Sequence, residues 1–175
     1  MKVLLHTCCA PCASASIERL KRLNFDVTLF FANSNIDTEE EYNKRLNEVA
    51  RLAHHDNVKL ITLPYDHDEW LKNVAKGLEN EPEKGQRCNK CFWYNLKKTE
   101  NYAKIHGFNK FSTSLTISPH KISENIFSAN DSELFLKENF KKNDGFKRSL
   151  ERSNQLQLYR QNYCGCEFSK NKKFP

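Results

Sequence analysis

Short apolar runs alternate with helix-type segments along the first two thirds of the chain. Buried strands are predicted for residues 2–7, 26–31, 58–63 and 110–114. Helices are predicted for residues 13–23, 38–54, 66–76 and 89–106, and Thr38 with Glu41 forms a capping box. Strands that alternate with helices build βαβ units. The pattern therefore predicts an α/β protein with a parallel sheet that is covered on both faces.

The length of the chain limits how this pattern is organised. A chain of 175 residues with 38% apolar content suits one α/β domain over residues 1–175. Ser118 as a cap and Pro119 at the first helical position predict a further helix. Residues 127–175 are expected to form a helical and loop segment that packs on the sheet. No apolar run approaches the length of a membrane span, so we expect a soluble, cytoplasmic protein without a membrane partner.

The net charge of +6 is unevenly distributed. Residues 137–175 hold 10 of the 28 basic and 4 of the 22 acidic side chains, so the rest of the chain is neutral. This segment includes a basic turn with Lys141 and Lys142. A local basic region favours a polyanionic partner, although a solvated tail is an equally simple interpretation.

Seven cysteines form three groups in a chain without an export signal, which favours metal or redox chemistry over structural disulfides. Cys8, Cys9 and Cys12 follow the first predicted strand, and Cys88 with Cys91 forms a C-x-x-C pair. One thiolate pair from each of these two segments suffices for tetrahedral zinc or for an iron–sulfur cluster. Spacing does not decide between the two, although the adjacent Cys8 and Cys9 are uncommon in zinc ribbons.

The third group is the Cys164-Gly165-Cys166 sequence near the end of the chain. Two thiols separated by one glycine can act as a dithiol/disulfide couple or can supply metal ligands. The flanking Arg160 and Tyr163 suit phosphate contact and base stacking, or simple packing.

Hydroxyl side chains follow the last predicted strand. Ser118 offers an anion-binding donor, and His120 and Lys121 add charge next to it.

Together these segments resemble the cobalamin-independent epoxyqueuosine reductase family. The matching segments, in family order, are 6–12, 87–92, 111–121, 140–145 and 159–169. The resemblance implies a Rossmann-like sheet of the adenine nucleotide α-hydrolase type. It also implies a [4Fe-4S] cluster and reduction of epoxyqueuosine to queuosine at the wobble position of tRNA, with electrons from a donor that the sequence does not identify.

The resemblance also implies roles for individual residues. Cys8, Cys9, Cys88 and Cys91 would hold the cluster, Cys164 and Cys166 would form a redox-active disulfide, and Cys12 would be a further ligand or contact an additional iron. From the residues themselves, His6 or Tyr163 is a candidate acid that protonates the leaving oxygen, and the other candidate substrate and tRNA contacts are Ser118, His120, Lys121, Lys141, Lys142 and Arg160.

Two other functions remain open from the sequence. One is a zinc-stabilised RNA-binding module, in which Cys8, Cys12, Cys88 and Cys91 are structural ligands. The other is a tRNA sulfur-transfer enzyme with a persulfide on Cys164 or Cys166. Sulfur transferases of this fold carry a Ser-Gly-Gly-x-Asp-Ser loop after the first strand, where this chain has Cys-Cys-Ala-Pro-Cys, which argues against ATP use.

Overall fold

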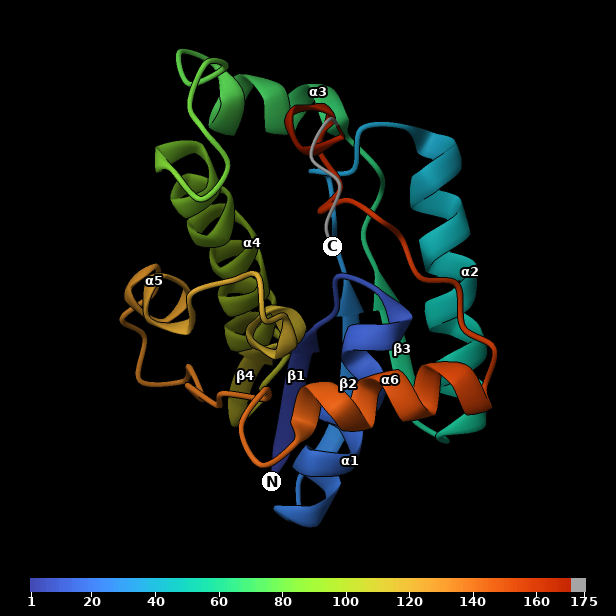
Figure 1. Cartoon of the computed structure of the whole chain (residues 1–175). Helices are drawn as coiled ribbons and strands as arrows, with labels where there is room; N and C mark the ends of the chain where they lie inside the picture. The colour runs from blue at the N-terminus through green and yellow to red at the C-terminus, as the bar shows by residue number, and fades with distance from the viewer. Residues whose placement is uncertain (171–175) are drawn as a thin grey trace.

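The computed structural model describes residues 1–170, whose centre is a four-stranded parallel sheet (Figure 1). Its strands are β1 (Lys2–His6), β2 (Asp26–Phe31), β3 (Lys59–Thr62) and β4 (Lys110–Thr113), in the order β3-β2-β1-β4. His6 lies opposite Phe30 of β2 and Thr113 of β4, so the carboxyl ends of three strands meet at one edge. The predicted α/β class with a parallel sheet is confirmed.

Helices and single helical turns connect and flank the strands. They are α1 (Ala10–Arg22), α2 (Glu39–His55), α3 (His67–Trp70), the π-helical turn η1 (Leu71–Ala75), α4 (Gln86–Ile105), the 3₁₀ turn η2 (Ser114–Ile117), α5 (Ser123–Ser128), α6 (Gly145–Gln155) and the 3₁₀ turn η3 (Glu167–Ser169). Within residues 1–170, no helix is long and apolar enough to cross a membrane.

Alternate side chains of the strands enter two separate cores, because successive residues of a strand point to opposite faces. Leu4, Phe30 and Phe111 pack with α4 and α5 on one face. Leu5 and Leu29 pack with α1 and α2 on the other face. Burial on both faces explains the nearly continuous apolar runs of these strands.

The helix predicted to start at Ser118 and Pro119 is wrong. Ser118 ends η2 with an extended ψ of 128°, and its hydroxyl accepts the backbone N–H of His120. The serine therefore stabilises a turn instead of capping a helix. The next helix, α5, begins only at Ser123.

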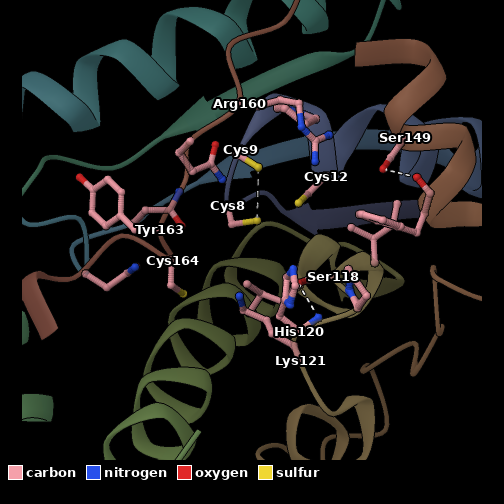
Figure 2. A pocket seen from close by; sticks show the side chains of 18 of the residues that line it. Cys8, Cys9, Cys12, Ser118, His120, Lys121, Ser149, Arg160, Tyr163 and Cys164 are labelled. Carbon is pink, nitrogen blue, oxygen red and sulfur yellow. Dashed lines mark hydrogen bonds between the residues drawn. The ribbon is translucent and has the colours of Figure 1, made fainter. Parts of the chain in front are cut away.

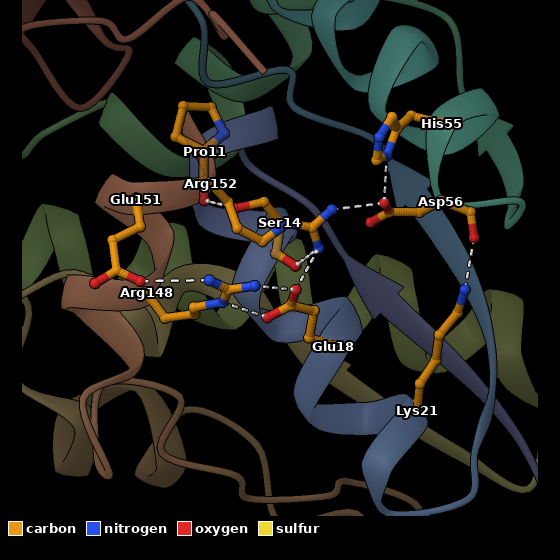
Figure 3. A network of polar contacts seen from close by, with 9 residues as sticks. All are labelled: Pro11, Ser14, Glu18, Lys21, His55, Asp56, Arg148, Glu151 and Arg152. Atoms are coloured by element: carbon orange, nitrogen blue, oxygen red, sulfur yellow. Dashed lines mark hydrogen bonds and ion pairs between the residues drawn. The ribbon is translucent and has the colours of Figure 1, made fainter. Parts of the chain in front are cut away.

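Residues 127–170 form the described part of the C-terminal segment. Its helix α6 lies against α1 (Figures 1 and 3). Arg148 binds both carboxylate oxygens of Glu18 at 2.9 Å. Arg152 donates to the Ser14 carbonyl at 2.8 Å and to Asp56 at 2.6 Å. These contacts connect α6 to α1 and to the residue that follows α2. Residues 171–175 of the predicted basic segment lie outside the described residues.

Arg152→Met is expected to lower the free energy of unfolding by about 3 kcal/mol, because it leaves the Asp56 carboxylate buried without its cation. Both side chains of this pair are 8% exposed. The matched variant Arg148→Met removes an arginine that is 42% exposed and should lower the free energy of unfolding much less, because solvent screens an exposed ion pair. Urea unfolding measures the loss of stability of both variants from the shift of the midpoint, provided that the m-value is unchanged. Equal losses would show that the burial of the Arg152 pair is unimportant.

Candidate metal centre and catalytic cavity

A cavity of about 530 Å³ opens at the carboxyl edge of the sheet (Figure 2). Its wall combines the turn after β1, the loop after β2, residues of α4 and α6, and the segments 115–121 and 160–164. Open parallel sheets bind ligands at this edge, in the crevice that forms where two adjacent strands lead to helices on opposite faces of the sheet.

Three cysteines point into this cavity from the end of β1 and the start of α1 (Figure 2). The Sγ atoms of Cys8, Cys9 and Cys12 all lie within 4.8 Å of one another, and those of Cys8 and Cys9 are 3.9 Å apart. Cys9 is the N-cap residue of α1, and Cys12 follows in the first turn. The strand end and the helix start thus bring the three thiols together.

The three thiols share a limited negative charge. Hydrogen bonds from Cys12 and Cys8 lower the pKa of Cys9 well below its ordinary value. Hydrogen bonds with Cys8 and Cys9 raise the pKa of Cys12 well above its ordinary value. Because the anionic form of one thiol disfavours that of the next, a site with several thiolates requires a cation.

The other four cysteines line an adjoining pocket, which shares Cys91, Cys164 and Lys121 with the main cavity. Cys88 and Cys91 lie in the first turns of α4, three residues apart on one side of the helix. Burial, followed by the nearby Cys164, raises the pKa of Cys91 well above its ordinary value. All seven cysteines lie in the described part of the chain and carry free thiols there.

Residues 158–170, here called the C-terminal strap, carry Cys164 and Cys166 along α2 towards α3 (Figure 1). Gly165 has a φ of +148°, and a Cβ there would lie 3.1 Å from the Asn35 amide nitrogen. Its carbonyl accepts the Asp37 N–H at 3.0 Å. Only glycine suits this conformation and this close approach.

Arg45 of α2 is the residue of the site that the sequence interpretation missed. Its side chain is 1% exposed, and Nη1 donates to the Cys164 carbonyl at 3.0 Å while Nε binds Glu41 at 2.7 Å. Its guanidinium also lies 5.1 Å from the centre of the Tyr163 ring. A detectable signal existed, because Arg45 occupies a position in the helical stripe of Tyr42 and Val49, where an apolar residue is the rule.

The predicted substrate residues divide into two sets. The main cavity is lined by His6, Ser118, His120, Lys121, Arg160 and Tyr163. Lys141 and Lys142 lie outside it. Lys141 is half-buried and donates to the Lys121 carbonyl, whereas Lys142 is exposed beside α6.

The charge or the hydrogen bond of three cavity residues is set by their surroundings. Burial lowers the pKa of His6 to about 4, so the ring is neutral at pH 7, and its Nδ1 lies 2.9 Å from the Thr113 hydroxyl. Burial opposes the charge of Lys121, but the sulfurs of Cys164, Cys8 and Cys12 raise its pKa overall. The Tyr163 hydroxyl donates to Asp37 at 2.8 Å, which turns it away from the cysteines (Figure 2).

Several buried polar atoms around the cysteines have no hydrogen-bond partner within residues 1–170. They include His6 Nε2, Arg45 Nη2 and Trp70 Nε1, three nitrogens that can donate. Burial opposes the charge of Arg45, but Glu41 and the nearby Cys9 raise the pKa of its guanidinium, and the Trp70 side chain lies close enough to Cys91 to favour its thiolate. Buried donors require an acceptor. These donors and thiols therefore fit an anionic, thiolate-bound metal group.

A parallel α/β sheet with clustered thiols at its carboxyl edge defines a cysteine-rich α/β protein that can hold a metal centre. The chain belongs to the epoxyqueuosine reductase QueH family, whose sequence model matches residues 3–172. It is therefore an oxidoreductase of the epoxyqueuosine reductase type, and the resemblance seen in the sequence is confirmed.

Curated relatives match nearly the whole chain. The epoxyqueuosine reductase QueH of Streptococcus pyogenes serotype M1 is 39% identical, over 95% of this chain and 69% of the relative. The protein of the same name from Acinetobacter baylyi is 41% identical, over 96% of this chain and 80% of the relative. The protein of the same name from Thermotoga maritima is 34% identical, over 95% of this chain and 89% of the relative.

Solved structures show the same fold at low sequence identity. The U34-tRNA thiolase NcsA from Methanococcus maripaludis, solved with its [4Fe-4S] cluster, aligns with a TM-score of 0.57 and 11% identity. The alignment covers 97% of this chain but 61% of that structure, so this chain spans about three fifths of its length. A predicted tRNA methyltransferase subunit from Methanocaldococcus jannaschii aligns with a TM-score of 0.50 and 13% identity.

Proposed function

We propose that this chain reduces epoxyqueuosine to queuosine at the wobble position of tRNA, in the cytoplasm, with a [4Fe-4S] cluster. The observation that carries the proposal is the cavity at the carboxyl edge of the sheet, where thiols from both ends of the chain meet in a member of this family. Its volume of about 530 Å³ suits one modified nucleoside.

Cys8, Cys9, Cys88 and Cys91 are the proposed cluster ligands, and Cys12 is a further ligand or contacts an additional iron. The close Sγ atoms of Cys8, Cys9 and Cys12 support this set, as does the C-x-x-C pair on α4, of which Cys91 lines the same cavity. When bound, such a cluster supplies single electrons at low potential. The buried donors His6 Nε2 and Arg45 Nη2 would then hydrogen-bond the anionic group.

Cys164 and Cys166 are the proposed redox pair. Opening the epoxide to an alkene consumes two electrons and two protons and releases water. Oxidation of two thiols to a disulfide releases two electrons and two protons, so the two half-reactions balance. An external electron donor then restores the dithiol. The position of Cys164 in the cavity wall, beside Lys121, supports this assignment.

The remaining cavity wall is assigned to the nucleotide. Ser118, His120 and Lys121 lie on one side, and Arg160 and Tyr163 belong to the strap on the other (Figure 2). The ammonium of Lys121 and the guanidinium of Arg160 suit a phosphate or the developing charge on the epoxide oxygen.

A zinc-stabilised RNA-binding module is the second candidate, because four thiolates also suit zinc. Anaerobically purified protein distinguishes the two. We expect about four irons and four sulfides per chain and visible absorbance. Mass analysis of nucleosides should show conversion of epoxyqueuosine in tRNA when a chemical reductant is added. A colourless protein with one zinc and no conversion would establish the second candidate.

A further inference from the structure

A second basic feature lies beside the catalytic cavity, in a groove of about 640 Å³ between α1 and α6. We call it the α1–α6 groove. Its basic lining residues are Arg19, Lys21, Arg22, Lys142, Lys147 and Arg148, and its acidic ones are Glu18, Asp144 and Glu151. The nucleotide cavity described above does not include any of these nine residues.

Contacts within the protein already neutralise or occupy half of these cations. Arg148 binds Glu18 and also Glu151, the latter at 3.3 Å (Figure 3). Arg19 binds Glu138 at 2.9 Å, and Lys21 donates to the Asp56 carbonyl. Glu18 and Glu151 are thus both engaged by Arg148.

Three cations remain available to a partner. Arg22, Lys142 and Lys147 are exposed, and none of them has an ion pair within residues 1–170. They come from the end of α1, the turn before α6 and the first turn of α6. With six basic and three acidic side chains, the lining of the groove has a surplus of positive charge.

The groove and the cavity share the same two helices. α1 contributes Pro11 and Cys12 to the cavity and Arg22 to the groove. α6 contributes Ser149 to the cavity and Lys147 to the groove. Cys12 and Arg22 are ten residues apart, about 15 Å along a helix. This distance is short enough for an RNA chain with one nucleotide in the cavity to place neighbouring nucleotides in the groove.

We propose that the α1–α6 groove binds the sugar–phosphate backbone of the RNA whose nucleotide enters the cavity. The inference rests on the proposed function, since it extends the substrate contact beyond the reacting nucleoside. Separate exposed cations suit successive phosphates. The aromatic residue that lines the groove, Phe140, is 2% exposed and offers no stacking surface, so the contact is to the backbone instead of to bases.

The test is RNA binding by the iron-loaded full chain. The variant Arg22→Gln, Lys142→Gln, Lys147→Gln removes the three available cations. The matched control Lys59→Gln, Lys72→Gln, Lys76→Gln removes the same charge from exposed lysines of β3 and the η1 region, outside the groove. The probe is a labelled tRNA anticodon stem-loop, titrated at several salt concentrations, and iron content is checked in each protein.

We expect the groove variant to weaken binding at least about tenfold and to reduce the slope of log K against log salt by about 2, since each lost phosphate contact removes about 0.7–0.9. The control should bind like the unmodified chain. Unchanged binding by the groove variant, or equal weakening by both variants, would overturn the inference. If the unmodified, iron-loaded chain bound no RNA, the proposed function would be contradicted instead, because its substrate is tRNA.

Discussion

Replacing Cys164 with serine is expected to lower multiple-turnover reduction of epoxyqueuosine by on the order of 100-fold or more while the iron content is unchanged. With serine at position 164 the proposed pair cannot release two electrons by forming a disulfide, whereas the proposed ligands Cys8, Cys9, Cys88 and Cys91 remain. Iron and sulfide analysis together with nucleoside turnover measures both effects in one preparation.

Cys91→Ser is the matched comparison, because Cys91 lines the same two cavities as Cys164. This variant should lose iron and visible absorbance together with activity. If Cys164→Ser also lost its iron, Cys164 would be a ligand and the redox-pair assignment would be refuted. If Cys91→Ser kept a full complement of iron, the ligand set would need Cys12 in place of Cys91.

Arg45→Met is expected to lower kcat about tenfold or more with little change in KM, because Arg45 holds the backbone of the proposed redox pair and does not line the proposed nucleotide cavity. Without the bond to the Cys164 carbonyl, the Cys164-Gly165-Cys166 turn loses the contact that holds it against α2. The same variant should change the dithiol/disulfide equilibrium with glutathione about tenfold, or about 30 mV.

The variants Arg45→Lys and Lys44→Met distinguish the effect of the hydrogen bonds made by Arg45 from the effect of its positive charge. A lysine at position 45 keeps the positive charge but lacks the planar fork that binds Glu41 and the Cys164 carbonyl together, so it should restore only part of kcat. Lys44 is exposed and contacts the Tyr159 ring of the same strap, so Lys44→Met should have little effect. An unchanged glutathione equilibrium in Arg45→Met would reduce Arg45 to a packing role.

Local signals in the sequence predicted the sheet and most helices well. Apolar runs marked all four strands to within one or two residues, and the Thr38 hydroxyl accepts the Glu41 N–H as the capping box predicts. The failure at Ser118 has a local cause, since the same serine and proline suit a turn as well as a helix start.

Contacts between distant segments were harder to predict. Spacing identified the cysteine groups, but only the fold shows that Cys164 lines the same cavity as Cys8, Cys9 and Cys12. Lys141 and Lys142 are adjacent in sequence, yet one is held by the Lys121 carbonyl and the other is exposed in the α1–α6 groove. The role of Arg45 depends on a partner 119 residues away, which no local pattern contains.

The C-terminal strap has a consequence for how the protein opens. The sheet is joined by continuous backbone ladders, whereas the strap is held mainly by side-chain bonds to α3 and to the loop before α2, such as His67 to Glu167 and Tyr163 to Asp37. Segments with few backbone bonds unfold locally long before the whole molecule does. Local detachment of the strap would expose Cys164 and Cys166, while Cys8, Cys9 and Cys12 would keep their places at the end of β1 and the start of α1.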